Sequence, residues 1–430
     1  MDTGFPTADW ARNGRSTATG QRSMGDPTRL FPLFPPLLAG CPASSTPAMQ
    51  YPLEIEYDYG CVPSDLLRQA PLPGLERWAP LLPPIKPGLS LGEGGTPLIA
   101  AERIASWIGL DSPLWLKDES RNPTWSHKDR LNYCVVSTAL AIGAPGIAVA
   151  SSGNHGAAAA AYAARAGLPC IVITSPTAQP AFRQFLAALG AFVAIVPTDE
   201  RWPLLQRVVA ETGYMPASNL TRFPTGNPFG PEGYKTIAYE IFAQLGGMVP
   251  GTVVAPTGYG ELLYGLAKGF RELQRFGLAT RVPRICSAEP ALRGPLAQAL
   301  RRNEAAVEVS GPASRAAGIA VTVNSYRGVV AVRDSGGSAL LFEEASMVEA
   351  TEHLAREGLW QEYSGVAGLA ALREARLRGQ EFASPVVAIL TSTGLKELPA
   401  AVEDVPYYAG AELDRLITAL AAGAGRDYAP

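Results

Sequence analysis

One lysine stands where its neighbours could make it reactive. Lys128 lies in the stretch NPTWSHKDR, after an Asn-Pro-Thr turn and directly after His127. A lysine amine acts as a nucleophile or a general base only when part of it is unprotonated, and burial or nearby cationic groups favour that form. On these nine residues alone, a solvated surface lysine is the alternative, because most lysines are exposed.

Three short turns rich in glycine, serine and threonine each connect an apolar run to a helical stretch. They occur in VASSGNHGAAAA, VVAPTGYGELLYG and VVAILTSTGLKE. Small residues let backbone N–H groups approach a ligand, and the positive end of a helix dipole favours an anion. One such turn is usually an ordinary connection, but three in one sheet indicate a phosphorylated cofactor. A nicotinamide dinucleotide is disfavoured, because TGYGELLYG lacks the GxGxxG spacing.

The segments that must position these turns alternate between short apolar runs and Ala-rich amphipathic stretches from about residue 97 onward. Runs such as GIAVAS, PCIVIT and VVAIL are typical of strands buried on both faces. The sequence therefore predicts an α/β fold with mainly parallel sheets and helices on both faces. Residues 1–35 are rich in Pro, Ser, Gly and Thr and are predicted to form a disordered tail.

Composition narrows the classes of partner. The net charge of −3 and the absence of a basic block argue against a nucleic-acid partner. No apolar run approaches the ~18 residues of a membrane span, and the N-terminus lacks the apolar region of a signal peptide, so we expect a cytoplasmic protein. The five cysteines are scattered without a CxxC pair, which is typical of free thiols in a reducing compartment. We expect no metal site.

Five stretches, in their order along the chain, resemble fold-type-II pyridoxal-phosphate enzymes, the superfamily of tryptophan synthase β and the serine and threonine dehydratases. They look most like threonine synthase. The stretches are KDESRNPTWSHKDR, SSGNHGAAAAAYAARAGL, NPFGPEGYKT, PTGYGELLYG and LTSTGLKE. The resemblance covers roughly residues 38–400 and implies a two-lobed enzyme that forms a homodimer.

The resemblance also implies how the chain divides. Residues 36–145 plus 239–405 would form a large cofactor-binding domain, and residues 146–238 a small mobile domain. Residues 406–430 would be a C-terminal extension. Closure of the small domain on the substrate would exclude water from the site.

The resemblance places the cofactor, pyridoxal 5′-phosphate, residue by residue. Lys128 matches the lysine that forms the Schiff base and afterwards removes the substrate Cα proton as general base. Asn154 matches the group that hydrogen-bonds the cofactor's 3′ oxygen, and Thr391 matches the hydroxyl that faces the pyridine nitrogen. The phosphate-binding turn matches Thr257, Gly258, Tyr259 and Gly260. Ser151 and Ser152 resemble the groups that receive the carboxylate of an amino-acid substrate, and His155 and Lys235 are further candidates for substrate binding.

The expected reaction follows from the pyridine partner. A threonine hydroxyl stabilises a protonated pyridine less than a carboxylate does, so the ring is a weaker electron sink. Elimination or replacement of a β or γ leaving group is then favoured over transamination. For Thr391 the structural alternative is a plain helix N-cap.

Several residues depart from the family pattern. Trp125 and His127 stand where the family has Gly and Phe, and the Trp side chain should fill space near Lys128. His155 resembles the form found in serine and threonine dehydratases. Tyr234 stands where threonine synthases usually carry Gln, and Glu261 where a small residue is common. The two histidines are candidates for acid/base groups or for packing residues with satisfied nitrogens.

Three hypotheses follow. The first is a threonine-synthase-like lyase that eliminates or replaces a leaving group, such as phosphate, on an amino acid. The alternative is a dehydratase or ammonia-lyase that acts on a hydroxy- or diamino-acid, which His155 and Trp125 favour. The third, a cofactor-binding regulator without catalysis, is opposed by the intact lysine and the three turns.

Overall fold

The computed structural model describes residues 6–68, 70, 72–397, 415 and 417–418. The chain up to Lys396 forms one compact unit, and residues 397–430 form a second. The predicted C-terminal extension, residues 406–430, therefore lies outside the described residues except at three positions. Within the described residues, no helix combines the length and apolar character needed to cross a lipid bilayer.

The N-terminal segment differs from its prediction. The sequence predicts a disordered tail over residues 1–35, but strand β1 (Ala18–Ser23) lies between β2 (Leu30–Pro32) and β3 (Leu53–Tyr57) and is antiparallel to both. The prediction fails for residues 6–35 because the polar side chains bind backbone groups instead of water. Gln21 is fully buried, and its amide donates hydrogen bonds to the carbonyls of Pro32, Leu33 and Pro35.

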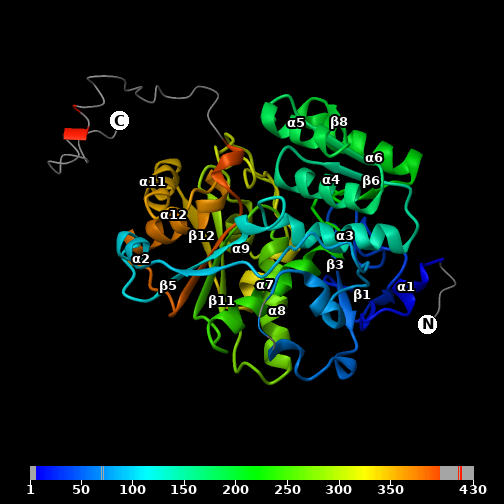
Figure 1. Cartoon of the computed structure of the whole chain (residues 1–430), viewed down its shortest axis with the longest axis horizontal. Helices are drawn as coiled ribbons and strands as arrows, with labels where there is room; N and C mark the ends of the chain where they lie inside the picture. The colour runs from blue at the N-terminus through cyan, green and yellow to red at the C-terminus, as the bar shows by residue number, and fades with distance from the viewer. Residues whose placement is uncertain (1–5, 69, 71, 398–414, 416, 419–430) are drawn as a thin grey trace. The chain divides into compact units, whose positions relative to one another are not determined.

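A six-stranded sheet forms one half of the compact unit (Figure 1). Its neighbouring strands are parallel except for the antiparallel pair β4–β5. In spatial order the strands are β12 (Ala339–Phe342), β11 (Arg284–Pro290), β10 (Thr252–Pro256), β13 (Val386–Leu390), β5 (Leu114–Asp118) and β4 (Leu98–Ala100).

Both faces of this sheet are covered by helices, as predicted. One core contains Val254 and Ala388 and is closed by α2 (Glu102–Ile108), α11 (Glu344–Ala355) and α12 (Tyr363–Leu377). The opposite core contains the alternate strand residues Val253 and Val387, together with residues of the helices on that side. Those helices are α8 (Glu261–Arg275), α9 (Pro295–Arg302) and α10 (Tyr326–Asp334). Successive side chains of a strand point to opposite faces, which explains the uninterrupted apolar runs.

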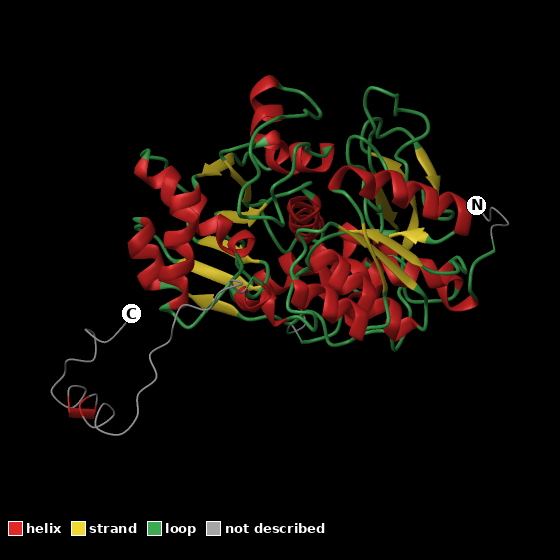
Figure 2. Cartoon of the chain, turned by 90° about the horizontal axis from the view of Figure 1, so that it is seen from above, coloured by secondary structure: helices red, strands yellow, loops and turns green. Residues whose placement is uncertain are grey.

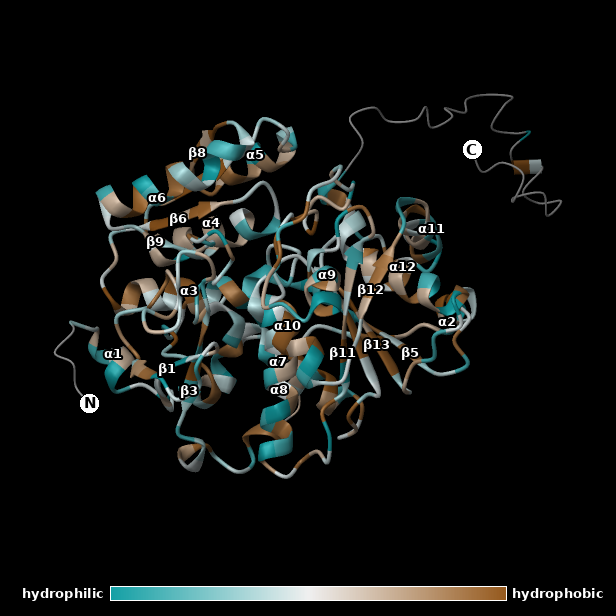
Figure 3. Ribbon diagram, turned by 180° about the vertical axis from the view of Figure 1, so that it is seen from behind, coloured by the Kyte–Doolittle hydropathy of each residue, from teal (hydrophilic) through white to brown (hydrophobic). Residues whose placement is uncertain are grey.

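A smaller sheet of four parallel strands lies beside the first (Figure 2). Its order is β8 (Phe192–Ile195), β7 (Cys170–Thr174), β6 (Ile147–Ala150) and β9 (Met215–Pro216). Helices α4 (Asn154–Ala166) and α5 (Pro180–Ala188) cover one face, and α6 (Arg201–Thr212) covers the other. Figure 3 shows hydrophobic colour along β6 and mixed colour on α5 and α6, as expected for a buried strand and amphipathic outer helices.

Two further helices connect the sheets. Helix α3 (Lys128–Ala141) packs against α4 and against α7 (Gly230–Gln244), and α7 packs against α8. The boundary predicted at residue 238 falls inside α7, although the four-stranded sheet and α4 to α6 all lie within 146–238. The short helices are α1 (Asp9–Arg12), η1 (Tyr59–Cys61), η2 (Leu66–Arg68), η3 (Leu75–Leu81), η4 (Glu119–Arg121), η5 (Thr198–Glu200) and η6 (Gly394–Lys396).

Candidate active site

Lys128 is the first residue of α3 and is held against the end of β13. The backbone N–H of His127 donates to the carbonyl of Thr391 at 3.1 Å, and Ser126 pairs with Ser392 in an isolated bridge. Burial lowers the pKa of Lys128, while the carboxylate of Glu261 acts in the opposite direction. A lowered pKa leaves more of the amine unprotonated at neutral pH, which is what a nucleophile towards an aldehyde requires.

Asn154 begins α4 and is fixed by residues from the far end of the sequence. Its Nδ2 donates to Glu362 Oε1 at 2.8 Å, and its Oδ1 accepts from Ser392 Oγ at 3.0 Å and from Lys396 Nζ at 2.6 Å. Burial raises the pKa of Glu362 and lowers the pKa of Lys396. Glu362 uses one of the two Nδ2 hydrogens, so the amide can still donate to a ligand oxygen.

The turn after β6 is tied to α6. Ser151 Oγ accepts a hydrogen bond from the backbone N–H of Gly156 at 3.0 Å. Ser152 Oγ lies 3.0 Å from Arg201 Nη1 and accepts its hydrogen bond. The two serines predicted to receive a carboxylate therefore lie at the start of α4, where the helix dipole favours an anion.

Both histidines near Lys128 are held neutral. Burial, aided by the charge of Lys128, lowers the pKa of His155 to about 3 and the pKa of His127 well below its usual value. His127 stacks on Tyr234 with ring centroids 5.3 Å apart, and its Nδ1 lies 3.3 Å from the carbonyl oxygen of Thr391. His155 Nε2 is buried without a hydrogen-bond partner among the described residues. A neutral imidazole can donate or accept a hydrogen bond but supplies no positive charge.

The turn 257–260 connects β10 to α8. A Cβ added at Gly258 would meet atoms of Gly318, Val321 and Ile319 at 3.6–3.8 Å, which is ordinary van der Waals contact, so this part of the turn packs against residues 318–321. Gly260 has a φ of +85°, and a Cβ there would lie 2.5 Å from Gly328 Cα, so the turn requires glycine. The ring of Tyr259 lies 6.3 Å from the ring of Trp202 on α6, which brings this turn close to the smaller sheet.

Lys235 does not lie with the other predicted site residues. Its side chain is fully buried, and its Nζ lies 2.9 Å from carboxylate oxygens of both Glu232 and Glu272. Although burial opposes it, the ammonium groups of Lys235 and Lys268 lower the pKa of Glu232 to about 2. The predicted contact with a substrate anion does not fit this position, because the amine is already committed to two carboxylates. Lys235 is therefore a structural ion-pair residue and not part of the proposed site.

Trp125 occupies a backbone conformation that favours glycine. Its φ is +58°, and its half-exposed ring lies 5.7 Å from the ring of Phe185 on α5. Its carbonyl accepts a hydrogen bond from Ser392 Oγ at 3.0 Å. The side chain thus reaches from the loop of Lys128 to the helices of the smaller sheet.

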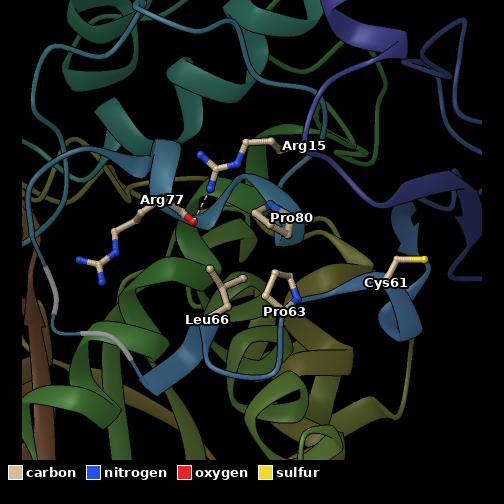
Figure 4. A pocket seen from close by; sticks show the side chains of 6 residues that line it. All are labelled: Arg15, Cys61, Pro63, Leu66, Arg77 and Pro80. Carbon is tan, nitrogen blue, oxygen red and sulfur yellow. Dashed lines mark hydrogen bonds between the residues drawn. The ribbon is translucent and has the colours of Figure 1, made fainter.

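A surface cavity of about 480 Å³ lies away from these groups. It is lined by Arg15, Cys61, Pro63, Leu66, Arg77 and Pro80. Figure 4 shows the guanidinium of Arg77 directed away from the other lining side chains. None of the predicted site residues lines this cavity, and we assign it no role.

Sequence reasoning missed Glu362 and Lys396. Lys396 stands inside the quoted stretch LTSTGLKE, so its motif could have drawn attention to it. Glu362, in LWQEYSG, carries no motif that would identify it, because its contact with Asn154 spans 208 residues. Among the described residues, no group of three or more His, Cys, Asp or Glu side chains could hold a metal ion.

The site residues that the fold brings together are chemically suited to bind pyridoxal phosphate. An amine with a lowered pKa suits an aldehyde, and a turn at the start of α8 that requires glycine at position 260 suits a phosphate. Two buried polar atoms near Lys128, His155 Nε2 and the Tyr234 hydroxyl oxygen, lack partners among the described residues, as expected where a ligand completes the hydrogen bonding. The fold and this set of groups define a fold-type-II pyridoxal-phosphate enzyme.

The chain belongs to the family of pyridoxal-phosphate-dependent enzymes, whose family model matches residues 89–392. It is similar to the threonine synthase of Methanosarcina acetivorans, with 31% identity over 380 residues that cover 86% of this chain and 92% of the other. It is also similar to the threonine synthase of Methanocaldococcus jannaschii, with 32% identity over 367 residues that cover 81% and 88%.

Solved structures share the fold. The T.th. threonine deaminase has 25% identity and a TM-score of 0.60, and the match covers 72% of this chain and 94% of that one. Maize serine racemase has 20% identity and a TM-score of 0.59 over 78% and 94%, which shows the fold alone. The predicted α/β fold, the cofactor and the class of lyase that eliminates or replaces a group on an amino acid are confirmed.

Proposed function

We propose that this enzyme is a threonine-synthase-like lyase whose substrate is an amino acid with a good leaving group, with O-phosphohomoserine as the first candidate. The observation that carries the proposal is the similarity to threonine synthases over 86% of the chain, combined with a partly buried lysine of lowered pKa at the start of α3. Phosphate is a suitable leaving group because it departs as a stable anion.

In this proposal the site residues have separate roles in proton transfer, substrate binding and cofactor binding. Lys128 takes the Cα proton, and Ser151, Ser152 and His155 receive the substrate carboxylate at the start of α4. Asn154 donates to the cofactor's 3′ oxygen, and the Thr391 hydroxyl faces the pyridine nitrogen. The turn of Thr257, Gly258, Tyr259 and Gly260 holds the phosphate. Bound pyridoxal phosphate supplies the electron sink that makes the Cα proton removable.

The position of Asn154 supports its proposed role. Three side chains hold its amide in one orientation, so its remaining donor would lose little rotational freedom when a ligand binds. The link between Ser152 and Arg201 would likewise couple the carboxylate-binding turn to α6. We propose that the four-stranded sheet with α4 to α6 moves as the small mobile domain, and that the enzyme is a cytoplasmic homodimer.

The test is incubation of the yellow holoenzyme with O-phosphohomoserine, with phosphate and threonine both quantified. We expect elimination of phosphate from Cγ, with threonine formed if water then adds at Cβ. Release of no phosphate from this substrate would refute threonine synthase activity.

The second candidate is a dehydratase or ammonia-lyase, which the neutral His155 and the bulk of Trp125 favour. Such an enzyme forms a keto acid and ammonia from a hydroxy- or diamino-acid without a second nucleophile. A panel of serine, threonine and 2,3-diaminopropionate, read out as keto acid, separates the two candidates. Keto acid from any of these, without threonine from the phosphate ester, would favour the second.

A further inference from the structure

The hydroxyl of Tyr234 is an unexplained polar group. The side chain is fully buried, and its hydroxyl has no hydrogen-bond partner among the described residues. A buried hydroxyl without a partner is destabilising, so native structures retain one mainly where water or a ligand completes it. In the proposed function no role is given to this residue, which stands where the family pattern has Gln.

The packing of α7 on α8 indicates where the hydroxyl lies. A Cβ added at Gly265 would lie 2.5 Å from Tyr234 Cβ, so the side chain starts directly against α8. Gly265 is about one helical turn beyond Glu261, the first residue of α8. Gly269, one turn further along α8, lies against Ala238, so α7 and α8 run in the same direction here. A helical side chain leans towards the N-terminus of its helix, so the ring of Tyr234 is directed towards the first turn of α8.

The ring of Tyr234 also borders the space above Lys128. It stacks on His127, and Lys128 Nζ lies 5.6 Å from its centroid. The hydroxyl therefore belongs to the region between the reactive lysine and the turn 257–260. The carboxylate of Glu261 is turned towards Gly226, within electrostatic range of both Lys128 and Tyr234.

We propose that the Tyr234 hydroxyl donates a hydrogen bond to a phosphoryl oxygen held at the N-terminus of α8. A phosphoryl group suits the position because the first N–H groups of a helix and its dipole attract an anion. A neutral hydroxyl adds a donor without adding charge, and burial keeps its proton in place by raising the pKa of Tyr234 well above its usual value. The inference rests on the proposed function, since the phosphoryl group belongs either to the cofactor or to a phosphorylated substrate.

The first arm of the test uses Tyr234→Phe with two ligands that differ only in the phosphate, pyridoxal phosphate and pyridoxal. Binding to the ligand-free full chain is followed by absorbance. If the cofactor supplies the phosphoryl group, the variant loses about 10- to 100-fold in affinity for pyridoxal phosphate and retains its affinity for pyridoxal. Tyr162→Phe is the matched control, because Tyr162 is equally buried but its hydroxyl donates to Glu93 at 2.7 Å.

The second arm tests the substrate as the source. If binding of both ligands is unchanged but KM rises about tenfold or more for an O-phospho amino acid and not for its O-acetyl ester, the substrate supplies the phosphoryl group. Equal behaviour of the variant and the wild type in both arms would overturn the proposal. Failure of the proposed function looks different, because the wild type would then bind pyridoxal phosphate but turn over neither ester.

Thermal unfolding of the ligand-free chain gives an independent reading. Removing an unsatisfied hydroxyl relieves its desolvation, so Tyr234→Phe should keep or raise Tm, by up to a few degrees. Tyr162→Phe should lower Tm, because the buried carboxylate of Glu93 loses one of its hydrogen-bond donors. A fall in Tm for Tyr234→Phe as large as that for Tyr162→Phe would mean a structural partner, and would overturn the proposal.

Discussion

Trp125 offers a direct test of backbone strain beside the reactive lysine. An L-residue with side chain pays about 1–2 kcal/mol for the left-handed conformation, which glycine adopts freely. The φ of +58° at Trp125 should therefore make Trp125→Gly more stable than Trp125→Ala. Both variants lose the same contact with Phe185, so their difference isolates the backbone.

The expected difference is about 1 kcal/mol, because part of the strain relief is offset by the greater freedom of glycine in the unfolded chain. In thermal unfolding with saturating pyridoxal phosphate, the Trp125→Gly variant should have a Tm about 1–2 °C higher than the Trp125→Ala variant. Such an order is the reverse of the usual one, in which alanine is the more stabilising residue.

Phe185 supplies the control at the other end of the same aromatic contact. It lies inside α5, where glycine is less favourable than alanine by about 1 kcal/mol. Phe185→Ala should therefore be more stable than Phe185→Gly. If alanine is at least as stable as glycine at position 125 as well, the strain at Trp125 does not exist and the reasoning fails.

Three further predictions concern the site itself. Lys128→Ala should reduce turnover at least about a thousandfold and give no borohydride-trapped adduct at position 128 by mass spectrometry; residual turnover near the wild-type rate would exclude its role. Glu261→Gln should lower the pKa of Lys128, since the carboxylate raises it, so the rate at which the ligand-free enzyme captures pyridoxal phosphate should reach its half-maximum at a lower pH than in the wild type. Asn154→Ala should cost about 1–3 kcal/mol of stability in thermal unfolding and weaken cofactor binding, because Glu362 and Lys396 lose a buried partner; an unchanged Tm and affinity would contradict this.

The strands and turns were predictable because they depend on short-range patterns. The expectation that all three turns lie in one sheet is wrong, because the turn after β6 belongs to the four-stranded sheet and the turns after β10 and β13 belong to the six-stranded one. GIAVAS and PCIVIT form β6 and β7, and the helical stretches between the strands form α4 and α5. The apolar runs identify strands buried on both faces, and the connection of each strand to a helix locates its turn. The same patterns located Asn154 at the start of α4.

The features that the sequence did not predict depend on contacts between residues far apart in the sequence. The composition of residues 1–35 suggested disorder, but Gln21 finds its partners only once β1 and β2 have paired. The amine of Lys235 lies between two carboxylates, one on α7 and the other on α8, and no local pattern reveals that pairing. Glu362 is likewise defined only by the meeting of α4 and the loop before α12.

The N-terminal sheet has a practical consequence for making shorter versions of the enzyme. Tyr57, at the end of β3, donates its hydroxyl to Glu232 and lies under the ammonium of Lys235, while the carbonyl of Ile55 accepts from Lys268. A fragment that begins at residue 89, where the family match begins, would expose the buried charges of Glu232, Lys235 and Lys268. It would also lack the residues of β3 that contact them. Tags and fusions therefore belong ahead of the first strand, and we expect the region that carries the family signature to be destabilised when it is expressed alone.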